Sequence, residues 1–485
     1  MNDMRKKVVT GLIWTYAERM LAQIISLVVT IILARLITPE HYGVIAIVTV
    51  FITIADTFAI NGMGNALIQK KNADEIDFST VFYFNIAFSL LIYVVFFFGA
   101  GLLASFYHMP ILVPVLRVMS IRIPIAAVNS VQQAYVARRM EFRKFFFATL
   151  GGTVVSAILG IALAYCNFGI WALVVQYLSN TFIDTIVLWF TVKWRPKRVF
   201  SCKRLKSLFS FGWKLLATSL LITVYSNIQD LAIGKKYTSS ELAYSNKGRQ
   251  FPALISTNIN TSITKVLFPA ISESQDNIVR VKAITRRAVS VGTYVLSPVL
   301  IGLAAISNNF ISILLTDKWM GCVPFLKLMC IVYLLQPIQT ASIQAMKALG
   351  RSDLYFKLEI IKKIFGTIVL VATIFMCDSV MAIIIGSLIT ELFSSVVNIP
   401  VNRKLLKYSY REQFADVIQT IIMTTIMTVV VTLLNKINMN RMILMILQIL
   451  TGGGVYLVLS VLSNNRDYLY IISIIKSMKK SKMEE

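Results

Sequence analysis

Apolar residues along this chain form long uninterrupted blocks, separated by short stretches that are polar and mostly basic. The blocks are about 20–25 residues long, which is enough for a helix to cross the hydrocarbon core of a bilayer. They do not alternate apolar and polar positions, as the strands of a membrane β-barrel do. The pattern predicts an all-α polytopic membrane protein with about fourteen transmembrane helices. These lie near 11–34, 42–64, 79–104, 113–135, 145–165, 170–191, 211–233, 241–265, 288–315, 322–346, 354–377, 379–401, 414–435 and 442–462.

The basic residues between these blocks are strongly biased to one side of the predicted membrane. If successive connections are assigned to alternate sides, one side holds 32 Lys and Arg residues and the other holds 6, while 10 of the 48 fall inside blocks. Connections rich in Lys and Arg stay in the cytoplasm. We therefore predict a multi-pass membrane protein with both termini cytoplasmic.

The composition supports this class and excludes others. Hydrophobic residues make up 57% of the 485 positions and charged residues only 15%, against about 25% in an average soluble domain. A soluble enzyme and a disordered chain are therefore excluded. The net charge of +25 is scattered in short clusters between apolar blocks, which disfavours nucleic acid as a partner. Five cysteines without a CxxC pair and two isolated histidines predict no metal site and no cofactor.

An internal repeat gives the architecture. Val113–Met119 recurs as Val323–Met329, which is 210 residues later, and Thr38–Glu40 matches Ser239–Glu241 at a spacing of 201. The spacings correspond to six blocks, so the two halves run in the same direction. Parallel repeats of this kind are typical of transporters. The predicted domains are a six-helix lobe (1–193), a basic linker (194–210), a second parallel six-helix lobe (211–402), two extra helices (403–463) and a basic tail (464–485).

Charged residues inside the predicted helices are the candidates for function. One such residue at the bilayer centre costs about 2.5–3.5 kcal/mol on insertion scales, so it should face a watery cavity or an acid. In the first helix, Arg19, Gln23 and Thr30 share one polar face. The alternative is that these residues only bond neighbouring helices, and at least one of the cations should do so. The predicted substrate-binding cations are Arg19, Arg117, Arg122, Lys214, Lys247, Arg249 and Lys327.

A cavity lined by such cations favours an anionic substrate, because guanidinium and ammonium groups suit phosphate and pyrophosphate. The chain has no GxxxxGK[ST] loop for ATP, so an ion gradient or the membrane potential should supply the energy. Three intramembrane acids are candidates for ion coupling: Asp56, Asp230 and Glu391. Asp56 is preferred, because it lies within its block with Thr53 on the same face. A structural hydrogen bond between helices is the alternative for Asp56.

Several short segments resemble the bacterial polysaccharide transporter family. They are Ala34–Gly43, Arg139–Arg143, Phe268–Ser272, Asp317–Trp319 and Ala348–Ser352, and their order and spacing carry the resemblance. The chain is thereby similar to oligosaccharide flippases of the multidrug/oligosaccharidyl-lipid/polysaccharide exporter superfamily, in particular to the lipopolysaccharide, colanic acid and teichuronic acid exporters.

The resemblance implies two six-helix lobes around a central cavity and transport by alternating access, driven by an ion gradient. The implied substrate is an oligosaccharide linked to polyprenyl (pyro)phosphate, moved from the cytoplasmic to the outer leaflet for surface polysaccharide such as O-antigen, capsule or exopolysaccharide. Implied partners are membrane lipids and the polysaccharide polymerase and glycosyltransferases.

Three other functions stay open. A multidrug antiporter of the same superfamily is disfavoured, because cationic drugs call for an acidic or aromatic cavity. A membrane polysaccharide polymerase or ligase would be an enzyme with a sizeable external loop, whereas every predicted external connection here is short. A lipid scramblase is the third alternative. The sequence therefore favours a transporter over an enzyme.

Overall fold

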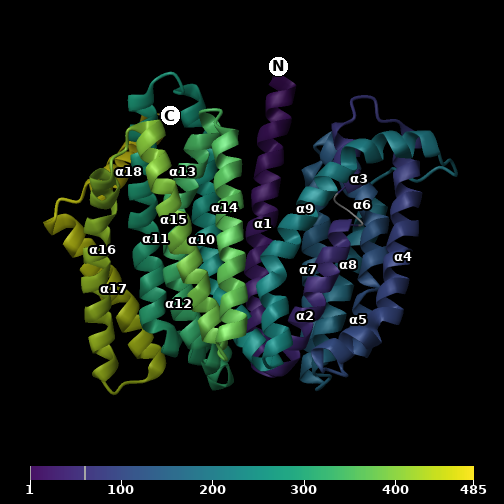
Figure 1. Ribbon diagram of the computed structural model, residues 1–485, viewed down its shortest axis with the longest axis horizontal. Helices are drawn as coiled ribbons and strands as arrows, with labels where there is room; N and C mark the ends of the chain where they lie inside the picture. Colours follow the sequence, from purple (N-terminus) through teal and green to yellow (C-terminus); the bar gives the residue numbers. More distant parts are fainter. Residues whose placement is uncertain (1, 59–61, 485) are drawn as a thin grey trace. The chain divides into compact units, whose positions relative to one another are not determined.

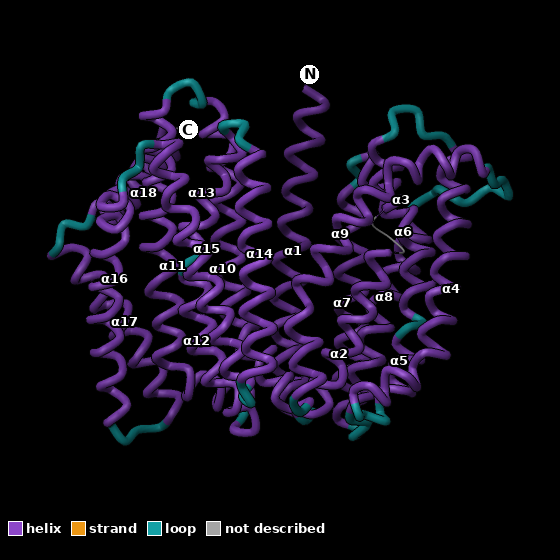
Figure 2. The backbone as a smooth tube through the Cα atoms, viewed as in Figure 1, coloured by secondary structure: helices purple, strands orange, loops and turns teal. Residues whose placement is uncertain are grey.

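The computed structural model describes residues 2–58 and 62–484, and every regular element in them is a helix (Figure 2). The all-α prediction is confirmed for this part of the chain. Contacts divide the chain into two compact units, Met1–Ala243 (unit 1) and Tyr244–Glu485 (unit 2). The predicted lobe boundaries at 193 and 211 are not tested by this division and stay a prediction.

Unit 1 contains nine helices within the described residues, labelled in Figure 1. They are α1 (Asn2–Leu36), α2 (Pro39–Asp56), α3 (Gly62–Gln69), α4 (Glu75–Tyr107), α5 (Leu112–Met119), α6 (Arg122–Arg139), α7 (Phe142–Tyr165), α8 (Ile170–Thr191) and α9 (Cys202–Lys236). The pairs α1 with α7, α7 with α8, and α4 with α6 pack side by side. Helix α9 packs on α2, α3 and α4, so it belongs to unit 1 by contact.

Unit 2 is built around the long helix α11, which contacts α12, α13, α16 and α17. Its helices in the described part are α10 (Ser239–Glu273, which begins at the end of unit 1), α11 (Ile278–Leu315), α12 (Val323–Leu334), α13 (Gln336–Ala348), α14 (Ser352–Met376), α15 (Val380–Leu406), α16 (Tyr410–Leu433), α17 (Arg441–Leu462) and α18 (Arg466–Glu484), with two short 3-10 turns at Asp317–Cys322 and Leu434–Lys436.

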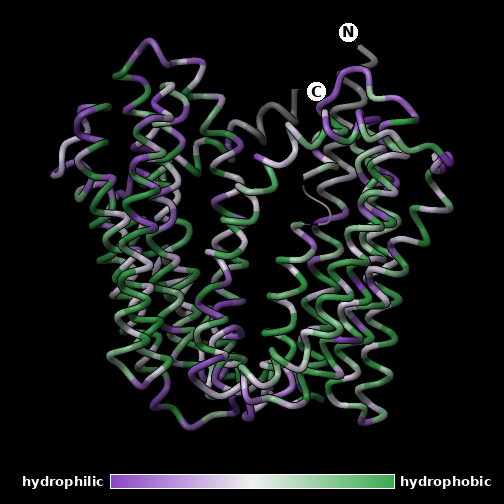
Figure 3. Tube along the Cα trace, turned by 45° about the vertical axis from the view of Figure 1, so that its right-hand side comes forward, coloured by the Kyte–Doolittle hydropathy of each residue, from purple (hydrophilic) through white to green (hydrophobic). Residues whose placement is uncertain are grey.

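Twelve segments of the described chain are long and apolar enough to cross a membrane. They correspond to twelve of the fourteen predicted spans. The other two predicted spans, the eighth and the eleventh, form α10 and α14, which are helical but are not among these twelve segments. In Figure 3 hydrophobic positions dominate the middle of most helices, and hydrophilic positions gather at their ends. The chain is therefore a multi-pass membrane protein, and the count of fourteen stays a prediction.

Two of the predicted spans are broken helices, and proline explains both breaks. Within 113–135, α5 ends at Met119 and α6 begins at Arg122, and within 322–346, α12 ends at Leu334 and α13 begins at Gln336. Pro124 and Pro337 lie in the first turns of α6 and α13. A proline ring clashes with the carbonyl four residues earlier, so the helix is interrupted on its N-terminal side. Helices broken at membrane depth are common around transporter sites.

Basic residues of three predicted cytoplasmic connections meet at one end of unit 1. Arg138 donates hydrogen bonds to the carbonyls of Lys70 and Lys71, and Lys70 and Arg204 both bind the buried carboxylate of Asp77. A capping box begins α4, because the N–H of Asp77 donates to the Asp74 carboxylate and the Asp77 carboxylate accepts from the N–H of Asp74. This capping bond lowers the pKa of Asp74.

The predicted external connections of unit 1 meet in the same way. Lys235 donates to the carbonyl of Phe106 and lies beside His108. The His41 ring lies against Gly169, whose φ of +56° is unfavourable for residues with a side chain. The alternation of connections predicted from the Lys and Arg counts is thus consistent with the packing within unit 1.

Unit 2 shows the same separation of its ends. Arg286 on α11 forms an ion pair with Asp416 and another with Glu412 on α16, and Arg287 lies near Asp467 on α18. At the other end, Arg441, the first residue of α17, binds Asp317 with an N–O distance of 2.8 Å. The first group belongs to predicted cytoplasmic connections and the second to predicted external ones.

Gly43 provides a test of the helix packing in unit 1. A Cβ atom at Gly43 would lie 1.8 Å from the carbonyl oxygen of Ser239. We expect Gly43→Ala to destabilise the protein by about 1–3 kcal/mol, because backbone atoms must move apart. Gly101→Ala is the matched control, since nothing lies within 4 Å of its Cβ position. Thermal unfolding of the purified variants measures both. Equal midpoints for the two variants would show that α2 does not approach Ser239 this closely.

Candidate functional site

Arg122 and Asp56, predicted to act separately, form one ion pair inside unit 1. The Arg122 Nη1 lies 2.8 Å from the Asp56 Oδ2, and its Nε donates to the Thr181 hydroxyl at 2.8 Å. Arg122 is the first residue of α6, and Asp56 is the last residue of α2. The other carboxylate oxygen of Asp56, Oδ1, is buried and has no hydrogen-bond partner among the described residues. The pair therefore ties the break between α5 and α6 to α2 and α8.

The break between α12 and α13 in unit 2 is tied in a similar way, without charges. Gln336 is the first residue of α13, and its Oε1 accepts from the Ser256 hydroxyl at 2.6 Å and from the Asn260 amide at 3.2 Å. Ser256 and Asn260 lie on α10. In both units, the first residue after the break in the span thus binds the helix that begins at a repeat segment. That helix is α2, at Thr38–Glu40, in unit 1 and α10, at Ser239–Glu241, in unit 2.

A second feature recurs in the two units, an amide that donates to a carboxylate. Asn129 on α6 donates to the Asp184 Oδ2 on α8 at 2.7 Å, and Gln339 on α13 donates to Glu391 on α15. The amides are 210 residues apart and the acids 207, close to the spacing of the sequence repeat. Within this chain, equivalent helices of the two units therefore carry equivalent polar contacts.

Three of the seven predicted cations are packed against their own unit. Arg117 donates to the Phe97 carbonyl at 3.0 Å, and its guanidinium carbon lies 4.6 Å from the centre of the Phe97 ring. Lys247 is buried, with its Nζ 3.1 Å from the Gln250 Oε1 and 5.7 Å from the Trp319 ring. Arg249 donates to Asn246 at 2.8 Å. These contacts favour structural roles for Arg117, Lys247 and Arg249.

The other cations differ in exposure. Arg19 on α1, Lys214 on α9 and Lys327 on α12 are exposed, and their side chains have no hydrogen bond or ion pair within the described part of the chain. Arg117 and Lys327 are repeat equivalents, yet Arg117 packs on a ring and Lys327 is open. The exposed three are therefore the cations that can reach a ligand without first breaking a contact.

The predicted coupling acids fall in different environments. Asp56 is paired with Arg122, and Asp230 on α9 is buried, with 6% of its surface exposed. Glu391 accepts from Gln339 and lies near Lys362 and Lys363 of α14. The second carboxylate oxygen of Asp56, Oδ1, is buried and has no hydrogen-bond partner in the described structure, so it is available to an added proton or ion.

Sequence reasoning did not assign functional roles to Asp184, Thr181 or Gln339. Thr181 and Gln339 are uncharged, so the charge count gave no reason to select them. Asp184 accepts a hydrogen bond from the Asn129 amide and lies near the Glu18 carboxylate. Glu18 in turn accepts a hydrogen bond from the Thr149 hydroxyl. The spacing of 210 between Asn129 and Gln339 is a signal in the sequence that could have identified both amides.

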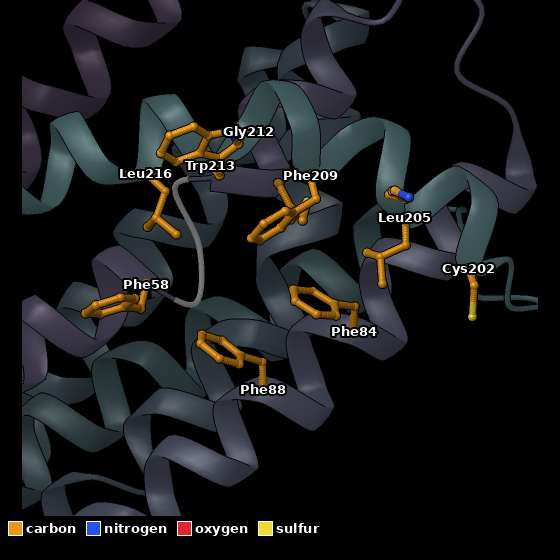
Figure 4. Close-up of a pocket in the computed structure, with 11 residues that line it drawn as sticks. Phe58, Phe84, Phe88, Cys202, Leu205, Phe209, Gly212, Trp213 and Leu216 are labelled. Atoms are coloured by element: carbon orange, nitrogen blue, oxygen red, sulfur yellow. The ribbon is translucent and has the colours of Figure 1, made fainter.

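Unit 1 also holds an apolar pocket of about 570 Å³ between α3, α4 and the start of α9. Its walls include Phe58, Phe84, Phe88, Phe209 and Trp213, whose side chains appear around a common space in Figure 4. Phe84 and Phe88 are stacked with ring centres 5.8 Å apart. None of the ten predicted site residues lines this pocket. The pocket is therefore separate from the polar contacts at the two helix breaks.

Comparison with known proteins identifies the sequence family. The family profile described as "Polysaccharide biosynthesis protein" matches residues 32–324. The chain is similar to the lipopolysaccharide biosynthesis protein WzxC of Escherichia coli (strain K12), with 24% identity covering 84% of each chain. It is also similar to the teichuronic acid biosynthesis protein TuaB of Bacillus subtilis (strain 168), with 26% identity covering 73% of this chain and 74% of the other.

Two solved structures share the fold. The lipid II flippase MurJ in an inward closed conformation matches with a TM-score of 0.75 at 15% identity, covering 94% of this chain and 99% of that one. A multidrug resistance transporter of the MATE family in an inward-facing conformation matches with a TM-score of 0.61 at 15% identity, covering 80% and 94%. At these identities the likeness shows the fold alone.

Proposed function

This chain belongs to the polysaccharide biosynthesis protein family, and from that premise we propose that it is an oligosaccharide flippase. It moves an oligosaccharide linked to polyprenyl (pyro)phosphate from the cytoplasmic to the outer leaflet of the bacterial plasma membrane, for surface polysaccharide synthesis. The protein is a transporter and not an enzyme, in keeping with relatives named for lipopolysaccharide and teichuronic acid biosynthesis and with the lipid II flippase fold.

The observation that carries this proposal is the set of cations that stay exposed on membrane helices. Arg19, Lys214 and Lys327 have no partner among the described residues, and each would be costly facing lipid. A pyrophosphate supplies the negative charge that such groups attract. The Arg122–Asp56 ion pair lies in the same unit as Arg19 and Lys214, and we assign this pair to the conformational change.

Transport follows an alternating-access scheme with an ion gradient as the driving force. Asp56 is the first coupling residue, because its Oδ1 is unpartnered while its Oδ2 holds Arg122. A proton or cation that binds Asp56 weakens the attraction between Asp56 and Arg122, so that α2 and α6 can move relative to each other. Asp230 and Glu391 are the further coupling candidates. Both termini are cytoplasmic in this scheme, and the polymerase and glycosyltransferases of the pathway are the expected partners.

Binding measurements on neutralised variants test the assignment of the cations. We expect Arg19→Gln, Lys214→Gln and Lys327→Gln each to weaken binding of a polyprenyl-pyrophosphate oligosaccharide by about five- to tenfold, as loss of one charge-assisted contact predicts. Lys265→Gln is the control, because Lys265 is an exposed lysine on α10 that is not among the seven candidate cations. Binding of the free oligosaccharide should change little in all four. Unchanged affinity in all three variants would contradict the role of these cations.

The multidrug antiporter is the alternative with the same fold. It predicts that a lipophilic cationic dye binds in competition with the lipid-linked sugar and that neutralising Arg19 or Lys214 strengthens dye binding. The flippase predicts no such competition. The exposed cations favour the flippase.

A further inference from the structure

The apolar pocket of unit 1 is covered by the start of one helix, here called the roof, and is lined by one cation. The roof is the start of α9, which contributes Leu205, Phe209 and Trp213, and the floor is the Phe84 and Phe88 pair of α4. Lys206 is the one charged residue among the eleven that line the pocket. It is exposed and has no ion pair within the described residues. An apolar cavity with a cation at its wall is complementary to an amphiphile with a negative head.

The roof is fastened to α4 by polar contacts that leave Lys206 available. The N–H of Ser201 donates to the Thr80 hydroxyl at 3.2 Å, and the N–H of Lys197 donates to the Ser79 hydroxyl at 2.9 Å. The neighbouring cation Arg204 is occupied by Asp77. These bonds hold the start of α9 against α4 beside the pocket.

The position along the chain places the pocket at the level of lipid head groups. The basic linker 194–210 ends within the roof, and the apolar part of α9 that can span a membrane begins at Gly212. Lys206 therefore lies where the polar linker enters the membrane, on the side that the positive-inside rule makes cytoplasmic. Trp213 is likewise an aromatic residue at an interface position.

We propose that this pocket binds the first part of the hydrocarbon chain of a polyprenyl phosphate lipid, with the phosphate on Lys206. The inference rests on the proposed function, because it concerns the lipid part of the same substrate on the cytoplasmic side. A pocket of about 570 Å³ lined by aromatic rings suits one hydrocarbon chain beside one anionic head. A polyprenyl phosphate has that form, whereas a glycerophospholipid brings two chains.

Cys202 offers a direct readout, because it is exposed and lines the pocket. The full-length protein is placed in nanodiscs of zwitterionic lipid, and alkylation of Cys202 by a maleimide is followed by mass spectrometry of its peptide. A long-chain polyprenyl phosphate should slow the alkylation in a saturable manner. The uncharged polyprenol should protect less well, and inorganic pyrophosphate should not protect. Exposed Cys166 serves as an internal reference and should react at an unchanged rate.

Two variants separate the head-group contact from general basicity. Lys206→Gln should raise the concentration of polyprenyl phosphate needed for protection by about fivefold, as expected for one lysine near an anionic head group. Lys203→Gln removes another exposed lysine, one turn earlier, which does not line the pocket, and should have no such effect. Protein amount and the Cys166 rate show whether each variant is folded.

Several results would overturn the proposal. Equal protection by phosphatidylglycerol would make the pocket a general lipid site, and equal effects of the two lysine variants would remove the head-group contact. Absence of protection at Cys202, while the same nanodiscs bind the polyprenyl-pyrophosphate oligosaccharide, would reject the pocket and leave the proposed function standing. Failure to bind that glycolipid at all would reject the proposed function instead.

Discussion

Asp77→Ala should lower the free energy of unfolding by about 2–3 kcal/mol. The Asp77 carboxylate is completely buried and accepts from Lys70 at 2.7 Å through both oxygens and from Arg204 at 3.3 Å. It also accepts from the N–H of Asp74. Alanine leaves two cations and one N–H without their shared acceptor. Lys70 and Arg204 are partly exposed, so the loss of unfolding free energy should be at the lower end of the range for breaking a buried ion pair.

Thermal unfolding of detergent-purified protein measures this loss, and Glu75→Ala is the matched control. Glu75 is half-exposed and lies 3.6 Å from the exposed Lys197, so its removal should change stability by less than about 1 kcal/mol. Because Asp77 also helps to fasten the start of α9 to α4, Cys202 should become more reactive in Asp77→Ala only. Equal midpoints for Asp77→Ala and Glu75→Ala would show that the buried carboxylate does not hold this end of unit 1 together.

Arg122→Gln should abolish transport and lower stability by about 2 kcal/mol, because it leaves the Asp56 carboxylate without a cation. The Thr181 hydroxyl also loses a donor. The double variant Asp56→Asn/Arg122→Gln removes both charges and should recover most of the stability. It should not recover transport, because the two neutral side chains no longer respond to a proton or cation.

The comparison of stability with transport decides whether the pair is structural or functional. Export of surface polysaccharide in cells reports transport, and unfolding of the purified variants reports stability. If the double variant exports as the natural protein does, the ion pair only holds helices together. Thr181→Val should act mildly on stability and leave export largely intact, since it removes one neutral partner and no charge.

The helices and their order follow from the apolar blocks, but the breaks within two of them do not. The block 113–135 is long enough for one spanning helix, so its length and hydropathy give one helix, whereas Pro124 interrupts it before Arg122. Pro337 acts likewise before Gln336. Both prolines are visible in the sequence, and their steric conflict with the preceding turn would have predicted the breaks.

Charge counting selected two residues that pair inside unit 1, Arg122 and Asp56, without showing that they combine. Arg122 was assigned to the substrate and Asp56 to an ion, and the structure brings the two together. Contacts between side chains of different helices depend on helix rotation and depth, which a single sequence does not determine. The same limit explains Arg117, because a ring such as Phe97 leaves no charge signal that would identify it as a partner.

Translocation of a labelled glycolipid in vesicles tests the central claim most directly. The purified chain is reconstituted with a fluorescent polyprenyl-pyrophosphate oligosaccharide, and a membrane-impermeant quencher reports the fraction in the outer leaflet over time. The account predicts movement well above that of protein-free vesicles, faster under an imposed ion gradient and lost in Arg122→Gln. It also predicts no comparable movement of a labelled phosphatidylcholine. Equal movement of both lipids, or none of the glycolipid under any gradient, would contradict the account.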